Sequence, residues 1–152
     1  MTENVTAFKA IVTTGLAALT ALWGWFGWLL LLWVGCMILD YATGTGAAMK
    51  NSEWKSSTAR EGIWHKVGCI VAVLVAAGAD LLIGFVVANI PAVTLPFEYS
   101  VFLCPLVVVW YIITELGSIA ENAAAMGAPV PEFLKKALQK TKDATEEVGN
   151  KM

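Results

Sequence analysis

The chain has 152 residues, a formal net charge of −2 and 14% charged residues, against about 25% in ordinary soluble domains. It is 58% hydrophobic, and its mean hydropathy is +0.68. This composition argues against a soluble globular domain, and the weak net charge gives no basis for binding nucleic acid. We therefore expect an integral membrane protein whose first partner is membrane lipid.

Long uncharged stretches indicate how many times the chain crosses the membrane. Residues 10–39 contain no charged side chain, and the stretch 67–90 contains only Asp80. Apolar runs of this length are typical of membrane-spanning helices. We expect an all-α membrane helical bundle in a transmembrane domain over residues 1–127. Its four transmembrane helices are expected at about 5–23, 28–49, 62–89 and 100–122.

The Trp-rich segment 23–28 lies inside an apolar region that is too long for one span. Its two glycines loosen a helix, and Trp prefers the level of the lipid headgroups. We expect a hairpin tip here, anchored at the membrane interface by Trp23, Trp25 and Trp28. The alternative is one long kinked helix, which leaves three spans instead of four.

Two polar breaks separate the later spans. The connector 50–66 carries Lys50, Lys55, Arg60 and Lys66, whereas the loop 90–99 has no Lys or Arg. Thr58-x-x-Glu61 fits a capping box ahead of the next helix. The positive-inside rule places the connector and the C-terminus in the cytoplasm and the 90–99 loop outside. The N-terminus is then inside with four spans and outside with three.

The C-terminal segment 128–152 differs in character from the rest. A short amphipathic helix is expected from near Pro131, with Phe133 and Leu134 on its apolar face and Lys135 and Lys136 on its basic side. A basic amphipathic helix can lie on an anionic membrane surface. We expect a cytoplasmic basic tail, either on that surface or as a soluble helix.

Three carboxyl groups lie inside the expected spans, those of Asp40, Asp80 and Glu115. A charged group near the bilayer centre costs about 2.5–3.5 kcal/mol on insertion scales, so these side chains face protein, water or a partner. The expected spans contain no comparably buried base, which suggests a polar path or a proton-sensitive assembly. The candidate lumen or helix–helix polar contacts are Asp40, Thr43, Asp80, Glu115, Ser118, Glu121 and Asn122.

Three interpretations of these acids stay open. They hold the helices in register through hydrogen bonds, or they line a water-filled lumen formed by many subunits. In the third interpretation, one of them binds a proton or a cationic substrate in a small transporter.

Catalysis and cofactor binding have little support in the sequence. His65 is the only histidine and lies beside Lys66 at an expected interface. The three cysteines, Cys36, Cys69 and Cys104, lie in apolar segments without the spacing of a zinc site. We expect no enzyme activity, no metal and no cofactor.

An ordered set of short segments resembles the phage holin family of the toxin-secretion and phage-lysis type, which includes a clostridial toxin-release holin and Cp-1-like lysis holins. The set covers about residues 31–138. Its segments are Asp40-Tyr41-Ala42-Thr43-Gly44 with Ala47-Ala48, Ser56-Ser57, Gly62 and Lys66 ahead of Asp80, Glu115-Leu116-Gly117-Ser118-Ile119-Ala120-Glu121-Asn122, Gly127-Ala128-Pro129-Val130-Pro131, and Leu134-Lys135-Lys136.

The resemblance implies a small protein that accumulates in the bacterial inner membrane as a homo-oligomer. Its oligomers would open large lesions at a set time, after which an endolysin or a toxin passes or reaches the wall. Two alternatives stay open: a small proton- or cation-coupled transporter, and a membrane scaffold that recruits a partner through residues 131–152.

Overall fold

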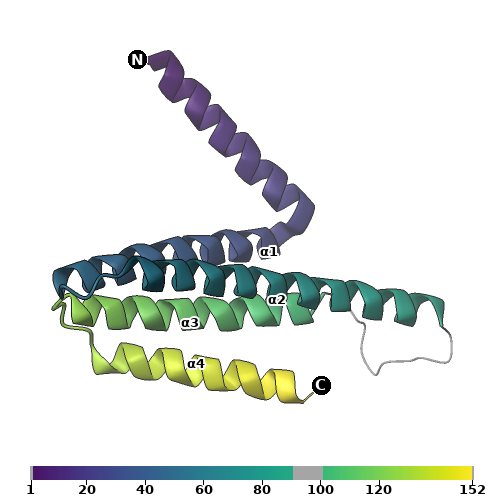
Figure 1. The fold of residues 1–152 in the computed structure, drawn as a ribbon. Helices are drawn as coiled ribbons and strands as arrows, with labels where there is room; N and C mark the ends of the chain where they lie inside the picture. The colour runs from purple at the N-terminus through teal and green to yellow at the C-terminus, as the bar shows by residue number, and fades with distance from the viewer. Residues whose placement is uncertain (1, 91–100, 152) are drawn as a thin grey trace.

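The computed structural model describes residues 2–90 and 101–151, without the side chains of residues 2–4, 16 and 18–23. Over these residues the protein is all-helical, as expected (Figure 1). The helices are α1 (Thr2–Lys50), α2 (Ser56–Asn89), α3 (Leu103–Ala125) and α4 (Glu132–Asn150). The loop expected at 90–99 falls largely on residues that the structure does not describe.

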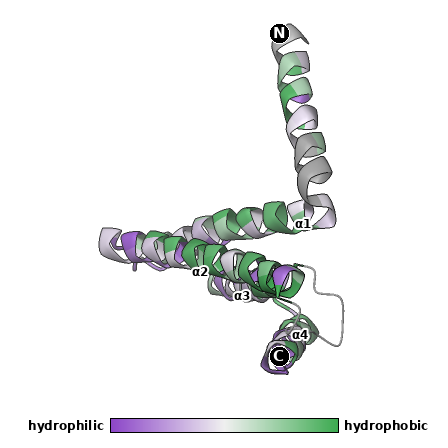
Figure 2. Cartoon of the chain, turned by 90° about the vertical axis from the view of Figure 1, so that its right-hand side faces the viewer, coloured by the Kyte–Doolittle hydropathy of each residue, from purple (hydrophilic) through white to green (hydrophobic). Residues whose placement is uncertain are grey.

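Helix α1 consists of two helical segments joined at Gly24. Gly24 has φ 55° and ψ −135°, a backbone conformation that is open to glycine and strained for other residues. The two segments diverge from this kink, and residues 2–23 stand away from the other helices (Figures 1 and 2). The chain therefore turns at Gly24, within the segment 23–28 where a hairpin tip was expected, and it does so without a loop. The choice between four spans and three stays a prediction.

Helix α2 begins earlier than expected. The connector between α1 and α2 is only residues 51–55, and α2 starts at Ser56 with Lys55 as an N-cap that makes no side-chain cap bond. The expected capping box is wrong, since Thr58 and Glu61 lie inside the helix. The run Ala59-Arg60-Glu61 consists of good helix formers, which explains why the helix extends this far.

Helix α3 lies at the centre of the bundle and contacts each of the other three helices. Around its apolar side, α1 contributes Trp33, and α2 contributes Val73 and Ala76. The Trp33 ring stacks on Tyr111 with 5.8 Å between ring centroids. The residues at the centre of this apolar core are Trp33, Cys36, Met37, Cys69, Val73, Ala76, Cys104, Val108 and Ile112.

Three described helical segments are long and apolar enough to cross a membrane. They are Gly24–Lys50, Ser56–Asn89 and Leu103–Ala125. The expected span at 5–23 is not among them. Leu74, Leu81 and Phe85 on α2 are more than 60% exposed in the single chain, which suits a surface covered by lipid or by another subunit.

Candidate functional site

Three charged side chains lie at one level of the bundle. Asp40 is ten residues before the end of α1, Lys66 ten residues after the start of α2, and Glu115 ten residues before the end of α3. Those three helix ends lie together, since Lys50 Nζ donates a hydrogen bond to the Met126 carbonyl oxygen and the connector 51–55 links the end of α1 to the start of α2. At the helical rise, each charge is about 15 Å from that end of the bundle.

The Lys66 ammonium group bridges the two carboxyl groups. Lys66 Nζ lies 2.9 Å from Asp40 Oδ2 and 2.7 Å from Glu115 Oε2. The Glu115 side chain is 7% exposed, the Lys66 side chain 16% and the Asp40 side chain 20%. Ion pairs this far from water are stable only when their remaining polar atoms are also bonded.

Asn122 and Thr43 supply further bonds to Asp40. Asn122 Nδ2 donates to Asp40 Oδ1 over 3.0 Å and reaches Thr43 Oγ1 at 3.2 Å. The Thr43 hydroxyl also donates to the carbonyl oxygens of its own helix, at Leu39 and Asp40. We call the five residues Asp40, Thr43, Lys66, Glu115 and Asn122 the polar layer. It connects α1, α2 and α3 through side chains, and Asn122 Nδ2 also lies 3.4 Å from the Asp40 carbonyl oxygen.

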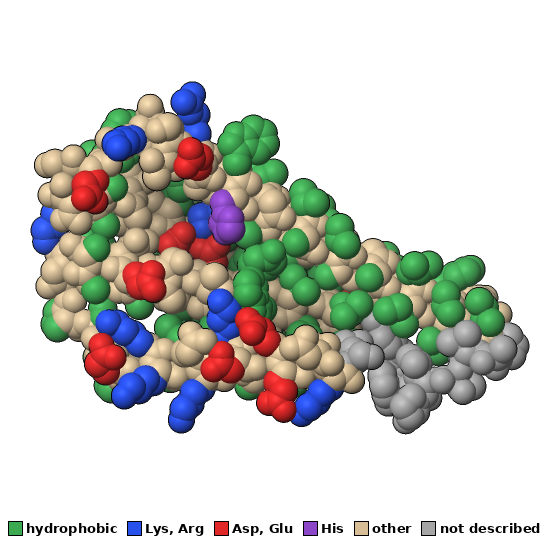
Figure 3. Space-filling view, turned by 60° about the horizontal axis from the view of Figure 1, so that its bottom comes forward, with side chains coloured by type: hydrophobic (Ala, Val, Ile, Leu, Met, Phe, Trp, Pro, Cys, Tyr) green, Lys and Arg blue, Asp and Glu red, His purple; other side chains and the backbone are tan. Residues whose placement is uncertain are grey.

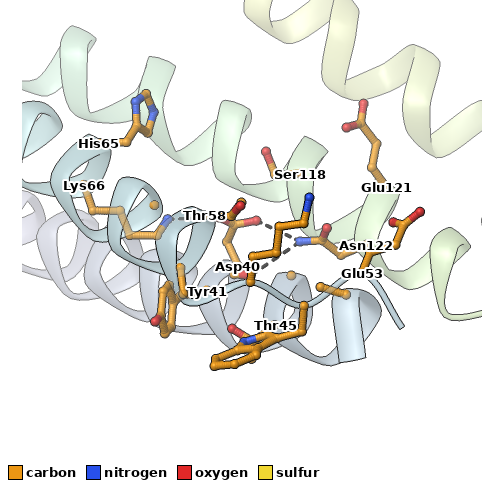
Figure 4. Close-up of a pocket in the computed structure, with 16 residues that line it drawn as sticks. Asp40, Tyr41, Thr45, Glu53, Thr58, His65, Lys66, Ser118, Glu121 and Asn122 are labelled. Atoms are coloured by element: carbon orange, nitrogen blue, oxygen red, sulfur yellow. Dashed lines mark hydrogen bonds and ion pairs between the residues drawn. The ribbon is translucent and has the colours of Figure 1, made fainter. Parts of the chain in front are cut away.

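A polar cleft leads into the polar layer from the connector end of the bundle. Its volume is about 370 Å³. Figure 4 shows Lys66 and Asn122 both directed toward Asp40 at the inner end of this cleft. Other lining residues are Glu53, Thr58, His65, Ser118 and Glu121. Water and small cations therefore have a route to the polar layer from one side.

Asp80 has a different environment from the other two acids. Its carboxylate accepts hydrogen bonds from the backbone N–H groups of the first residues of α3, with Leu103 N at 2.8 Å and Cys104 N at 2.7 Å. Phe102 N lies 3.2 Å from the same carboxylate. These N–H groups have no partner within their own helix, and the positive end of the helix dipole favours a negative charge there. Asp80 therefore caps α3 from α2.

An apolar core separates Asp80 from the polar layer. Lys66 and Asp80 are 14 residues apart on α2, or about 21 Å along its axis. Between them, α2 contributes Cys69, Val73 and Ala76 to the core, and each of these side chains is less than 9% exposed. The described residues of one chain thus form no continuous polar path from the cleft to Asp80.

The other predicted site residues lie outside this network. Ser118 donates to the Thr114 carbonyl of its own helix, and Glu121 is exposed where α3 borders the cleft. Trp25 is 69% and Trp28 50% exposed, whereas the Trp23 side chain lies outside the described residues.

In α4, Lys135 pairs with Glu132 at 3.3 Å and Lys136 is exposed. The three cysteines are buried and free, as expected for small apolar residues.

Sequence reasoning missed Lys66 as a site residue. The expectation that no base is buried with the acids is wrong, because Lys66 was assigned to a polar connector. The signal that identifies it is the helical continuity of residues 56–66, which carries Lys66 about 15 Å into α2.

The comparisons with known proteins agree with this architecture. The sequence profile of the bacteriophage holin family matches residues 17–143. An uncharacterized protein of Halalkalibacterium halodurans is 35% identical over 122 residues, which cover 80% of this chain and 84% of that protein. An uncharacterized protein of Clostridium perfringens strain 13 is 34% identical over 103 residues, covering 68% of this chain and 67% of the relative.

A second Clostridium perfringens relative, an uncharacterized 14.9 kDa protein, is also 34% identical, over 68% of each chain. No solved structure matches the chain. The family is not a family of enzymes, and the described residues include three helices long and apolar enough to cross a membrane, so the protein is a multi-pass membrane protein. The profile match over most of the chain, together with helices long and apolar enough to cross a membrane, shows that the chain belongs to the bacteriophage holin family.

Proposed function

We propose that this protein is a holin that oligomerises in the bacterial inner membrane and opens lesions at a set time. The lesions release an endolysin or a toxin, or give it access to the cell wall. Under this proposal the connector 51–55 and α4 begin on the cytoplasmic side, where the positive-inside rule puts the basic residues. The loop expected at residues 90–99 is then on the outer side of the membrane.

The observation that carries the proposal is the position of the polar layer. It lies about 15 Å into a bundle whose outer surface on α2 is apolar, and a cleft of about 370 Å³ reaches it from the connector end. The core between Trp33 and Val108 closes the rest of the single chain. A path for ions or proteins therefore has to form between chains, which favours an assembly over a one-chain transporter.

In mechanistic terms, opening changes what the polar layer touches. In scattered or clustered subunits, Lys66 satisfies Asp40 and Glu115 within one chain. In the open assembly, part of the layer faces water, because lipid is the environment that charged side chains avoid most strongly. Asp80 keeps the outer end of α3 fixed to α2 during this change. It acts in this proposal as a cap instead of a lumen residue.

The test is inducible expression in bacteria with two simultaneous measurements, membrane potential and release of a cytoplasmic protein. A holin gives an abrupt loss of potential together with protein release. A transporter is tolerated on expression and releases no protein. Depolarisation without protein release would favour a small pore over a large lesion.

A further inference from the structure

Helix α4 packs antiparallel along α3, at the depth of a membrane-spanning helix. Trp110 Nε1 donates to Glu146 Oε1 over 2.8 Å, and Lys142 Nζ lies 4.6 Å from the centre of the Trp110 ring. Trp110 is 15 residues before the end of α3, or about 22 Å along its axis. The contact is therefore far from the helix end at which α4 begins.

The contact continues to the last turn of α4. A Cβ atom added at Gly149 would lie 3.4 Å from Leu106 Cδ2, so Gly149 sits directly against α3. The α4 residues that are partly buried are spaced along one side of the helix: Leu138, Lys142, Thr145 and Gly149. This contact side is narrow and partly polar, and no residue of α4 is fully buried.

The docked helix leaves two unlike surfaces exposed along its length. One carries charge, from Lys136, Lys140, Asp143 and Glu147. The other is apolar, with Phe133 75% and Val148 46% exposed. Figure 3 shows the charged side chains gathered along α4 and at the connector end, and hydrophobic side chains over the projecting part of α2.

Lipid does not suit the charged surface of α4 and water does not suit the apolar one. A hydrocarbon environment leaves the ammonium and carboxylate groups without partners. The wall of an aqueous lumen offers both environments, since it has water on one side and a neighbouring subunit beside it.

We propose that α4, docked on α3, forms part of the lumen wall of the open assembly. Its charged surface faces water, and its apolar surface, which includes Phe133 and Val148, meets a second copy of this chain. The apolar outer surface of α2 then faces away from the lumen. This inference rests on the proposed holin function and adds to it the face of the subunit that lines the opening.

The test uses the full-length chain in which Cys36, Cys69 and Cys104 are replaced by alanine, after lysis by this parent is established. Two variants probe α4: L106C/G149C with a short bis-maleimide for docking, and K140C with a membrane-impermeant charged maleimide for water. The controls are L106C/K136C, since Lys136 lies near the start of α4 whereas Leu106 of α3 contacts its last turn, and L74C on the apolar surface of α2. Both reagents are applied to membranes after the onset of lysis.

We expect L106C/G149C to cross-link and L106C/K136C not to, and K140C to react about tenfold faster than L74C, because a thiol must reach water to ionise and react. Lysis without the 106–149 cross-link would overturn the inference by putting α4 away from α3. A cross-link with K140C as unreactive as L74C would overturn it too. A wild-type chain that neither depolarises cells nor releases protein would instead refute the holin function, and the inference with it.

Discussion

At Lys66, one ammonium group lies between two carboxyl groups that come from different helices. The arrangement costs desolvation on all three side chains and is kept favourable by short contacts and by Asn122. Removing one of these buried charges should therefore destabilise the fold more than replacing all three by neutral side chains. We therefore propose that the polar layer holds α1, α2 and α3 in register.

Replacing Lys66 by Met leaves Asp40 and Glu115 without their cation. We expect the free energy of unfolding in detergent micelles to fall by about 3–5 kcal/mol, measured by denaturant titration with circular dichroism. The neutral triple variant D40N/K66M/E115Q is the control and should regain most of that loss. A K66M protein as stable as the parent, or a triple variant as unstable as K66M, would contradict the ion-pair account.

Asp80 is predicted to stabilise the start of α3. D80N keeps one oxygen acceptor but loses the charge, and D80L leaves Leu103 N and Cys104 N without partners. Loss of a helix cap costs about 0.5–2 kcal/mol, so stability should fall in the order parent, D80N, D80L. Amide hydrogen exchange over residues 103–106 should quicken in the same order.

The control for Asp80 is E61Q, because Glu61 is an exposed acid on the same helix. Its exchange rates at the start of α3 should equal those of the parent. Unchanged exchange in D80L would show that the cap does not hold this helix end, and unchanged lysis timing in both Asp80 variants would remove Asp80 from the mechanism.

Among the helices, small residues determine how closely α1 and α3 approach. A Cβ added at Gly44 would lie 3.4 Å from Asn122 Nδ2, and one at Gly46 would lie 3.5 Å from Met126 Sδ. Nothing lies within 4 Å of a Cβ added at Gly35. Close approach through small residues replaces burial from water as the source of association in lipid.

Leucine at Gly44 should push Asn122 away from Asp40 and separate α1 from α3. Overpacking of this kind costs about 1–3 kcal/mol, measurable as a lower melting temperature in micelles. The matched variant G35L adds the same side chain to the same helix at an open position and should melt with the parent. Equal melting of both variants would mean that this face of α1 is not a packing surface.

The sequence predicts helices well where apolar length decides, and less well where local backbone chemistry decides. The spans over 28–49 and 100–122 and the helix after Pro131 are close to the observed ones. The break at Gly24 falls where the sequence predicts one, but its loop-free form could not be predicted, because the hydrophobic pattern is the same for a hairpin and for a kink. The cap of α3 was missed because its acceptor, Asp80, is distant in sequence from the N–H groups that it binds.

The polar layer shows the same division between local and long-range information. Asp40, Glu115 and Asn122 are visible in the sequence as polar residues in apolar helices. Their pairing depends on three helix ends lying together, and that depends on the short connector 51–55, which the sequence reading took to be longer. Lys66 enters the site only once α2 is extended to Ser56.

As a whole, the protein has two unlike sides. One side is the apolar surface of α2, and the other is α4, which is held on α3 through Trp110. Figure 2 shows residues 2–23 of α1 departing from both. One side of the molecule is thus suited to lipid and the other to water. A single subunit surrounded by lipid cannot give both sides the environment that suits them. Assembly around an aqueous space satisfies both at once.

Deleting residues 131–152 tests this two-sided organisation. Since no residue of α4 is fully buried, the truncated protein should still insert into membranes and keep the helices α1, α2 and α3. It should lyse cells later than the parent, because the Trp110 side of α3 would meet water without the charged surface of α4. Lysis timing and the amount of protein in the membrane fraction are the two measurements.

W110F is the matched control for the deletion, since it keeps α4, removes the bond to Glu146 and leaves a smaller aromatic ring beneath Lys142. Its lysis should be delayed in the same direction by a smaller interval. A truncated protein that is abundant in the membrane yet never lyses cells would favour the scaffold alternative, in which residues 131–152 recruit a partner. Truncated protein and parent lysing at the same time would leave α4 no part in opening, because a helix that lines the lumen cannot be removed without changing the surface that water meets.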